Sequence, residues 1–260
     1  MSARLRAIAR ETVQIAERGG YRSATGVEVR LDVAPAVAGT RLYLPDDPVP
    51  EAPGGAATTI EVTGESTLAA ARRLGGDVAA LVFASARNAG GGFLNGAQAQ
   101  EESIARSSAL YPCLRAAGDF YAYHRSRPQL TYSDRVIHSP RVPVFRDDRG
   151  ELLAEPYPVT FLTAAAPNLA AIRQNQPELI AEVPAVLLRR AKRVLAVAAA
   201  HGHRRLVLGA WGCGVFGNDP AVVAGAFAEA LRDGPFDQVV FAVLGPNRAA
   251  FTAVFAGGAR

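Results

Sequence analysis

The sequence predicts an α/β protein whose largely parallel central sheet carries helices on both faces. Two observations lead to this fold class. Short apolar runs typical of buried strands recur along the chain, and they alternate with segments in which apolar residues return every three or four positions, as in an amphipathic helix. Parallel strands are joined by crossovers that are usually helical, so this alternation indicates strand–helix–strand units. Ligands of such sheets bind beyond the carboxyl ends of the strands.

We expect residues 1–55 to form an N-terminal extension packed on a core of residues 56–260, all within one structural unit. The extension opens with a helix that ends at Gly19 and Gly20. Residues 27–44 have the composition of short strands, and the Pro- and Gly-rich residues 45–55 that of a surface connection. The apolar stripe of the opening helix comprises Leu5, Ile8, Ala9, Thr12, Ile15 and Ala16.

The core is predicted to begin with a strand, a helix and a buried strand at residues 58–63, 66–74 and 78–84. Farther along come an apolar run at 159–166, a long amphipathic helix at 183–200 and a buried strand at 206–210. The pair Asp219 and Pro220 then opens another helix, and residues 239–244 form the last strand. One face of the long helix carries Val183, Val186, Leu187, Ala191, Val194, Leu195 and Ala198.

The composition is that of a globular protein, with 49% hydrophobic and 20% charged residues. No apolar run approaches the length of a membrane span, and charges interrupt the N-terminal segment too often for a signal peptide. The two cysteines, Cys113 and Cys213, lack a disulfide pattern and fit a reducing compartment, so we expect a cytoplasmic protein. A monomer is the default expectation, since the sequence does not indicate an oligomeric state. The net charge of +4 is compatible with an anionic partner, or with an arginine-rich genome composition.

The first group of candidate site residues follows the strand 78–84. Three glycines, Gly90 to Gly92, allow backbone to approach a ligand closely and to adopt positive φ. Glu101 and Glu102 then open a helix that we expect to continue through Leu110. Acidic residues favour a helix N-terminus through the helix dipole, which would explain the pair without any function. Neighbouring side chains diverge by about 100°, so two functional carboxylates would do different jobs: one reaches the reacting bond while the other anchors a hydroxyl.

These residues resemble a known signature. Gly90-Gly91-Gly92, seven residues and then Gln100-Glu101-Glu102 are similar to the motif of poly(ADP-ribose) glycohydrolases. The flanking Asn88-Ala89 and residues 103–108 resemble the bacterial-type members, and the similarity extends over most of the chain. The resemblance implies a macrodomain-like, three-layer α/β/α fold with a mixed, largely parallel sheet and an N-terminal helical and strand extension.

The second group of candidate residues lies between the strand 206–210 and the helix that Asp219 opens. A glycine-rich turn there presents N–H groups that suit a diphosphate, although a tight turn around a buried Trp211 would account for the same pattern. It is not a P-loop, since no Lys-Ser/Thr pair follows. In macrodomains this loop cradles the ADP-ribose diphosphate. The resemblance thus implies ligand contacts from Asn88, Ala89, Gly90, Gly91, Gly92, Gln100, Gly212, Gly214, Val215, Phe216, Gly217 and, at the rim, Asn247.

The implied activity is hydrolysis of the ribose–ribose O-glycosidic bond, with Glu102 as general acid and base and Glu101 binding a ribose hydroxyl. The substrate would be poly(ADP-ribose) or ADP-ribosylated proteins and the product ADP-ribose, with no cofactor, metal, membrane or stable nucleic-acid partner. Two alternatives remain open: a mono-ADP-ribosyl hydrolase, and a non-catalytic ADP-ribose-binding macrodomain. The acidic pair argues against the binding module, because a diphosphate ligand does not need two more negative charges.

Several other residues are assigned structural roles. Cys213 has no histidine partner near it in sequence for thiol catalysis, and His201 and His203 lack companion ligands at metal-site spacing. We expect a core position for Trp211, a surface position for His124, a structural role for His138 and a hairpin turn at residues 147–150.

Overall fold

The computed structural model describes residues 2–50, 54, 57–232 and 234–256. Its centre is a seven-stranded sheet in the order β3-β6-β7-β5-β8-β9-β4. Strands β7, β5, β8, β9 and β4 run parallel to one another, whereas β6 is antiparallel to both β7 and β3. The predicted mixed, largely parallel sheet is therefore confirmed. The strands are β3 (Arg41–Tyr43), β4 (Thr59–Thr63), β5 (Val78–Phe83), β6 (Val136–Arg146), β7 (Leu152–Ala164), β8 (Arg205–Leu208) and β9 (Gln238–Ala242).

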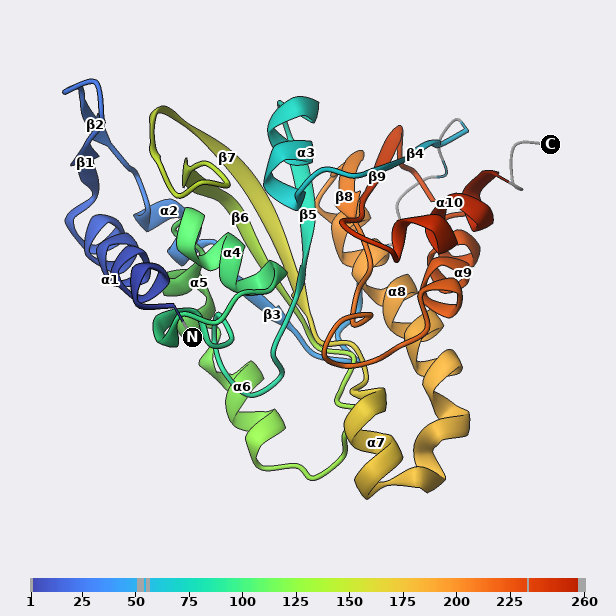
Figure 1. The fold of residues 1–260 in the computed structure, drawn as a ribbon. Coiled ribbons are helices and arrows are strands. Elements are labelled where there is room, and N and C mark those ends of the chain that lie inside the picture. Colours follow the sequence, from blue (N-terminus) through green and yellow to red (C-terminus); the bar gives the residue numbers. More distant parts are fainter. Residues whose placement is uncertain (1, 51–53, 55–56, 233, 257–260) are drawn as a thin grey trace.

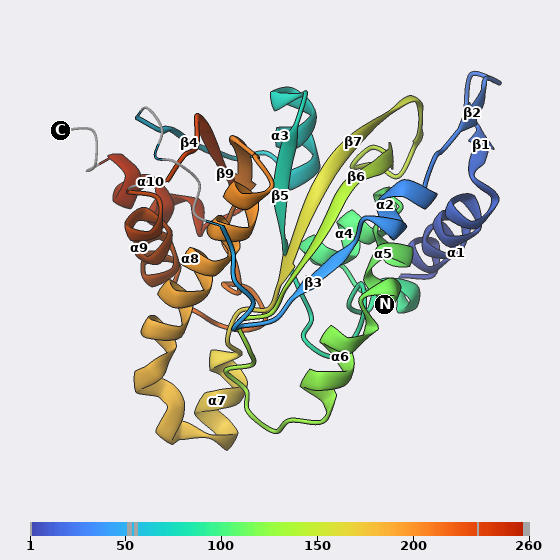
Figure 2. The same cartoon turned by 180° about the vertical axis from the view of Figure 1, so that it is seen from behind.

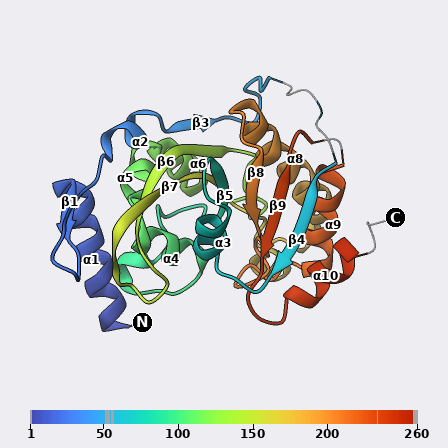
Figure 3. The same ribbon diagram turned by 90° about the horizontal axis from the view of Figure 1, so that it is seen from above.

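Helices cover both faces of this sheet (Figure 1, and Figure 2 from behind). One apolar core lies between the sheet and the helices α2 to α6, and a second core lies on the face covered by α7 to α10. The view from above in Figure 3 shows the sheet running between the two groups. The helices are α1 (Ala3–Arg18), α2 (Ala34–Ala38), α3 (Thr67–Leu74), α4 (Gln100–Ser107), α5 (Leu110–Ala116), α6 (Gly118–Arg125), α7 (Leu169–Asn175), α8 (Val183–Ala200), α9 (Pro220–Ala230) and α10 (Arg248–Ala256).

The N-terminal segment contains the predicted helix and one element that was not predicted. Helix α1 ends at Gly19, whose φ of 70° lies in the left-handed region and whose N–H donates to the Ile15 carbonyl. Residues 27–44 contain β3 and β2 (Glu28–Arg30), which forms a hairpin with β1 (Gly20–Arg22), but α2 lies between them. The expectation of strands throughout this segment was wrong because Pro35, in the first turn of α2, and its alanine neighbours favour a short helix.

The N-terminal segment contributes a strand to the core sheet, because β3 pairs with β6 at its edge. The boundary between an extension and a core at residue 56 stays a prediction. Of the predicted surface connection at 45–55, residues 51–53 and 55 lie outside the described part of the chain. No helix of the described chain is both long enough and apolar enough to cross a membrane.

The helix expected to run from Glu101 through Leu110 is broken. The chain becomes extended at Ser108, which forms an isolated bridge with Val144, and the Ala109 N–H donates to the Pro143 carbonyl at 2.9 Å. Pairing with β6 thus ends α4 at Ser107, and a new helix, α5, begins at Leu110. Tertiary contact with the sheet overrode the helical periodicity.

The expectation for His124 was also wrong. Its side chain is 1% exposed, with Nδ1 2.8 Å from the Phe120 carbonyl and Nε2 2.8 Å from Ser133 Oγ. The neighbouring arginines in the sequence suggested a surface position, but successive residues of a helix point to different sides. Two other expectations are confirmed. Trp211 is buried and its indole N–H donates to the Ala164 carbonyl at 3.0 Å, and residues 147–150 form the turn of the β6–β7 hairpin.

Candidate active site

A cleft of about 930 Å³ lies at the carboxyl ends of the parallel strands. This is the edge of an open α/β sheet at which ligands bind. Its walls come from the segments that follow β4, β5, β8 and β9, from α4, from the β6–β7 turn and from Leu5 and Ile8 of α1. The cleft therefore gathers chain segments that are far apart in sequence: residues 64–69, 83–85, 98–104, 146–150, 210–212, 214–216 and 242–244.

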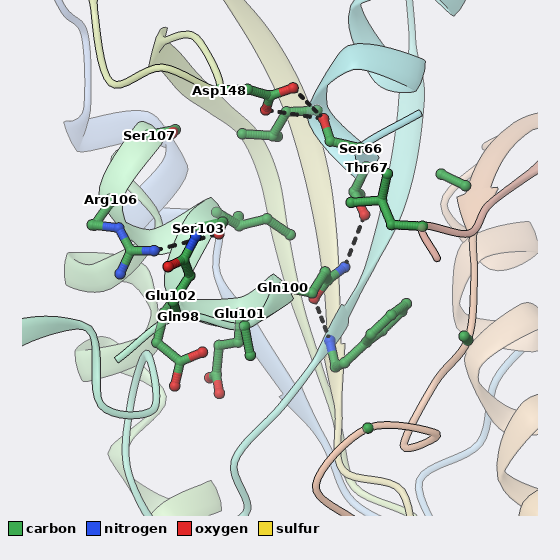
Figure 4. A pocket seen from close by; sticks show the side chains of 18 of the residues that line it. Ser66, Thr67, Gln98, Gln100, Glu101, Glu102, Ser103, Arg106, Ser107 and Asp148 are labelled. Atoms are coloured by element: carbon green, nitrogen blue, oxygen red, sulfur yellow. Dashed lines mark hydrogen bonds between the residues drawn. The ribbon is translucent and has the colours of Figure 1, made fainter. Parts of the chain in front are cut away.

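Gln100 fixes the start of α4 against the sheet (Figure 4). Its Oε1 accepts a hydrogen bond from the Phe83 N–H at 2.9 Å, and its Nε2 donates to the Leu81 carbonyl at 2.7 Å and to Thr67 Oγ1 at 3.1 Å. Gln100, a predicted ligand contact, lines the cleft, and its amide docks α4 onto β5 and α3. The two carboxylates that follow are consequently held at a fixed height above the sheet.

Glu101 is the buried member of the acidic pair, with 3% of its surface exposed. Its Oε2 accepts a hydrogen bond from the Ser85 N–H at 2.6 Å, whereas its buried Oε1 has no hydrogen-bond partner among the described residues. Burial raises the pKa of the Glu101 carboxyl well above its usual value, the Ser85 N–H opposes this rise, and the charge of Glu102 adds to it. Glu101 therefore retains its proton at a higher pH than an exposed glutamate does.

Glu102 is half-buried and is held by the glycine loop. Its Oε1 accepts a hydrogen bond from the Gly92 N–H at 2.9 Å, and a Cβ at Gly91 would collide with the same oxygen. Gly90 and Gly91 have φ of 69° and 60°, so the predicted positive φ is confirmed at two of the three glycines. Figure 4 shows both carboxylates pointing away from Ser66 and Asp148, on the opposite side of α4.

The second loop is held by Asn218. This side chain is 2% exposed, and its Nδ2 donates to the carbonyls of Pro167 at 2.8 Å and Gly212 at 3.0 Å. Gly212 has a φ of 72°, and a Cβ there would meet Asn218 Nδ2 at 2.6 Å. The loop after β8 is thus tied to the segment after β7. Its cleft-lining members include Gly212, Gly214, Val215 and Phe216, all of which were predicted as ligand contacts.

Cys213 in this loop has no nucleophilic character. Burial, and to a lesser degree the charge of Asp219, raise the pKa of its thiol to about 12, so the thiolate is scarce at neutral pH. Within the described ranges no three His, Cys, Asp or Glu residues lie so as to hold a metal ion.

Some predicted residues lie outside the cleft walls. Asn88 is exposed, and its backbone N–H donates to Ser85 Oγ at 3.2 Å. The glycine run supports Glu102 from behind instead of lining the cleft, and Asn247 lies beyond the rim residue Leu244. The predicted contacts absent from the walls are Asn88, Ala89, Gly90, Gly91, Gly92, Gly217 and Asn247.

Sequence reasoning missed the walls made by Ser66, Thr67, Asp148 and residues 242–244. Ser66 caps α3, accepting from the Ala69 N–H at 3.0 Å, and its hydroxyl donates to the Asp148 carboxylate. A signal for the α3 wall was present, because Ser66 follows a strand just as the two predicted loops do. No comparable signal marks Asp148, which reaches the cleft from an antiparallel hairpin.

Comparisons with a family model and with solved structures point to the same family. The family described as "Microbial-type PARG, catalytic domain" matches residues 9–147. The structure of poly(ADP-ribose) glycohydrolase from Thermomonospora curvata is similar at 54% identity and a TM-score of 0.92, covering 98% of this chain and 100% of that one. A second structure of the Thermomonospora curvata enzyme, bound to the inhibitor ADP-HPD, gives 53% identity and a TM-score of 0.89, with 97% and 99% covered.

A structure of the Deinococcus radiodurans poly(ADP-ribose) glycohydrolase in complex with ADP-ribose is 46% identical, with a TM-score of 0.83 and coverage of 88% of this chain and 99% of that one. A search of curated proteins gave no match.

Proposed function

Because this chain belongs to the microbial-type poly(ADP-ribose) glycohydrolase family, we propose that it hydrolyses the ribose–ribose O-glycosidic bonds of poly(ADP-ribose) and releases ADP-ribose. One observation carries the proposal for this chain's own residues. Two adjacent carboxylates lie on the first turn of α4, at the wall of a cleft of about 930 Å³, and the N–H of Gly92 holds one of them. That volume lies within the range usual for ligand clefts and accommodates a nucleoside diphosphate sugar.

Cleavage at the anomeric carbon needs a proton donor. The departing ribose oxygen is a poor leaving group until it is protonated, and the sugar that remains develops oxocarbenium character. Glu102 supplies the proton to the bridging oxygen as the C–O bond breaks. Water then adds to the anomeric carbon and gives a proton back to the Glu102 carboxylate. Acid–base catalysis of this kind contributes about 10²- to 10⁴-fold in rate.

Glu101 has a different role in the proposal. Its Oε2 is engaged by the Ser85 N–H, and its Oε1 is the remaining hydrogen-bonding position. A sugar hydroxyl that reaches this oxygen fixes the ribose relative to Glu102. Orientation of the reacting bond is itself a large contribution to catalysis.

The diphosphate lies against the loop after β8, whose Gly212, Gly214, Val215 and Phe216 line the cleft, because the N–H groups of a glycine-rich turn suit an anion. Negative phosphate oxygens near the anomeric carbon then stabilise the positive charge that develops there. We propose ligand contacts from the residues already named: Gln100, Gly212, Gly214, Val215 and Phe216 line the cleft, and Asn88, Ala89, Gly90, Gly91, Gly92, Gly217 and Asn247 lie in the segments next to its walls. We further propose that the protein acts as a cytoplasmic monomer, on poly(ADP-ribose) or ADP-ribosylated proteins.

The test is incubation of the purified protein with labelled poly(ADP-ribose) and identification of the products. Wild type should release ADP-ribose, and Glu102→Gln should lose about 10²-fold or more of this activity while binding ADP-ribose in calorimetry as wild type does. Glu178→Gln, at an exposed position of the 3₁₀ helix η2 (Pro177–Glu182), is the matched control and should remain active. Normal turnover by Glu102→Gln would refute the assignment. Release from singly modified protein but not from polymer would favour a mono-ADP-ribosyl hydrolase, and binding without any release a non-catalytic module.

A further inference from the structure

Arg106 connects the helix that carries the acidic pair to the loop that holds Glu102. It lies one turn after Glu102 on α4 and is 5% exposed. Its Nη1 donates to the Ala97 carbonyl at 2.6 Å. The Ala97 N–H donates in turn to the Gly92 carbonyl at 3.1 Å, and the Gly92 N–H donates to Glu102 Oε1 at 2.9 Å. These contacts form a closed ring that starts and ends on α4.

The ring is anchored from outside by α1. The Thr12 hydroxyl donates to the Arg106 carbonyl at 2.6 Å, and Thr12 is 1% exposed. Arg146 of β6, itself 3% exposed, donates from Nε to Thr12 Oγ1 at 3.1 Å and from Nη2 to Glu11 at 2.7 Å. Its third contact, from Nη1 to the Gly150 carbonyl at 2.8 Å, reaches the hairpin turn at the cleft wall. Figure 1 shows α1 lying alongside α4.

Helix α4 needs such an anchor. It has eight residues, and helices of this length are marginal without tertiary support. The last carbonyls of a helix have no partner within it, and α4 ends where Ser108 turns extended. The Arg106 carbonyl is one of these groups and is buried, so without the Thr12 hydroxyl it would lack a partner. A buried polar group left without a hydrogen bond costs about 1–3 kcal/mol.

We propose that Arg106 is a positioning residue for Glu102, and that Thr12 of α1, braced by Arg146, fixes Arg106. The N-terminal helix thereby contributes to the active site in two ways: Leu5 and Ile8 line the cleft, and Thr12 supports Glu102 through α4 and the glycine loop. The inference rests on the proposed function, since it concerns the placement of the acid in that reaction.

The test compares Thr12→Val, which keeps the shape but lacks the hydroxyl, with Thr12→Ser, which keeps the hydroxyl. Thr12→Val should lower kcat on polymer about 10- to 100-fold, because small displacements of a catalytic group are costly, with the dissociation constant for ADP-ribose within about twofold of wild type. Thr12→Ser should recover most of kcat. Thr25→Val, which removes an exposed hydroxyl in the β1–β2 turn, is the control and should leave both quantities unchanged.

A purely structural role predicts otherwise. If Thr12→Val lowers the melting temperature but the folded protein keeps the wild-type kcat, the inference is overturned. Should Thr12→Val fail to fold, Arg106→Lys takes its place, since lysine keeps the charge but loses the fork that holds Ala97 and Ser103. Unchanged kcat in that variant also overturns the inference. An inactive wild type would overturn the proposed function, and this inference with it.

Discussion

The backbone N–H of Gly92 donates a hydrogen bond of 2.9 Å to Oε1 of Glu102. The preceding residue, Gly91, approaches the same oxygen so closely that no side chain fits there. The glycine run and the acidic pair, separated by seven residues in the sequence, are therefore one structural unit. The chain between them forms the 3₁₀ helix η1 (Phe93–Asn95) and then begins α4, and this path accounts for the spacing.

We expect Gly91→Ala to lower activity by about 10²-fold or more. The added methyl group displaces the Glu102 carboxylate, and the φ of 60° adds backbone strain of about 1 kcal/mol for any L-residue. Activity per folded molecule, measured on polymer, tests this. Gly225→Ala is the matched control, because Gly225 lies inside α9 with no atom within 4 Å of the added Cβ, and it should be as active as wild type and slightly more stable. Equal activity of the two variants would contradict the prediction.

Glu101 should make stability depend on pH. Because burial raises the pKa of its carboxyl in the folded state, folding keeps a proton that the unfolded chain gives up above about pH 4.3. Its contribution is fully present below that pH and is lost as pH rises toward the folded-state pKa, by about 1.4 kcal/mol per pH unit. Glu101→Gln removes this loss. Urea unfolding between pH 5 and 8 should show wild type losing stability relative to Glu101→Gln as pH rises, and parallel curves would rule this out.

Much of the fold follows from local sequence. Apolar runs located β5, β7 and β8, and Asp219, whose side chain accepts from the Ala221 N–H at 2.8 Å, marked the start of α9. These features are set by neighbours in the chain. The break in α4 was not predictable in this way, because it depends on pairing between Ser108 and Val144, two segments that only the folded sheet brings together.

The site likewise has a part that local sequence predicts and a part that depends on long-range contacts. The loop after β8 follows its strand directly, and the segment after β5 leads through the glycine run to Glu101 and Glu102, so the rule for sheet edges located both groups. The support behind Glu102 was invisible, because Thr12, Arg106 and Arg146 come from α1, α4 and β6 and have ordinary sequence surroundings. Long-range hydrogen bonds of this kind leave no spacing pattern in a single sequence.

Asn218 should be needed for both stability and binding. Replacement by Ala leaves the Pro167 carbonyl without this donor and leaves the Gly212 carbonyl with only the backbone N–H of residue 218, at a cost of about 1–3 kcal/mol. The loop then loses its fixed position, so ADP-ribose should bind more weakly. Titration of ADP-ribose followed by the fluorescence of the single tryptophan, Trp211, next to Gly212, would measure this. Asn175→Ala, at an exposed end of α7, is the control, and comparable losses in both variants would contradict the prediction.

Three histidines should destabilise the protein in mild acid. His138 is buried beneath His201, with ring centroids 3.6 Å apart, and its Nε2 lies 3.2 Å from Nε2 of His203. Tyr43 contacts His201 and Asp77 contacts His203, and Arg41, which lies over the Tyr43 ring, adds a positive charge near His201. Burial, followed by the charges of His201 and His203, lowers the pKa of His138 to about 3.

The sign follows from this depression. Below about pH 6.5 His138 is protonated in the unfolded chain but stays neutral in the folded protein. The free energy of unfolding is therefore unaffected above about pH 6.5 and falls by about 1.4 kcal/mol per pH unit below it. His138→Gln retains a hydrogen-bonding side chain without titrating. Its unfolding free energy should fall less steeply than that of wild type between pH 6.5 and 5, and equal slopes would show that His138 does not carry the effect.

The position of β4 has a consequence for how the molecule is made. This strand leaves the ribosome long before β9, which is its neighbour in the sheet. Until β9 emerges, β4 has no partner and the cleft lacks the wall that residues 242–244 provide. Pairing across such a sequence separation is slow and leaves strand edges open meanwhile. The nascent chain thus gains a complete substrate cleft only after β9 and residues 242–244 have been synthesised.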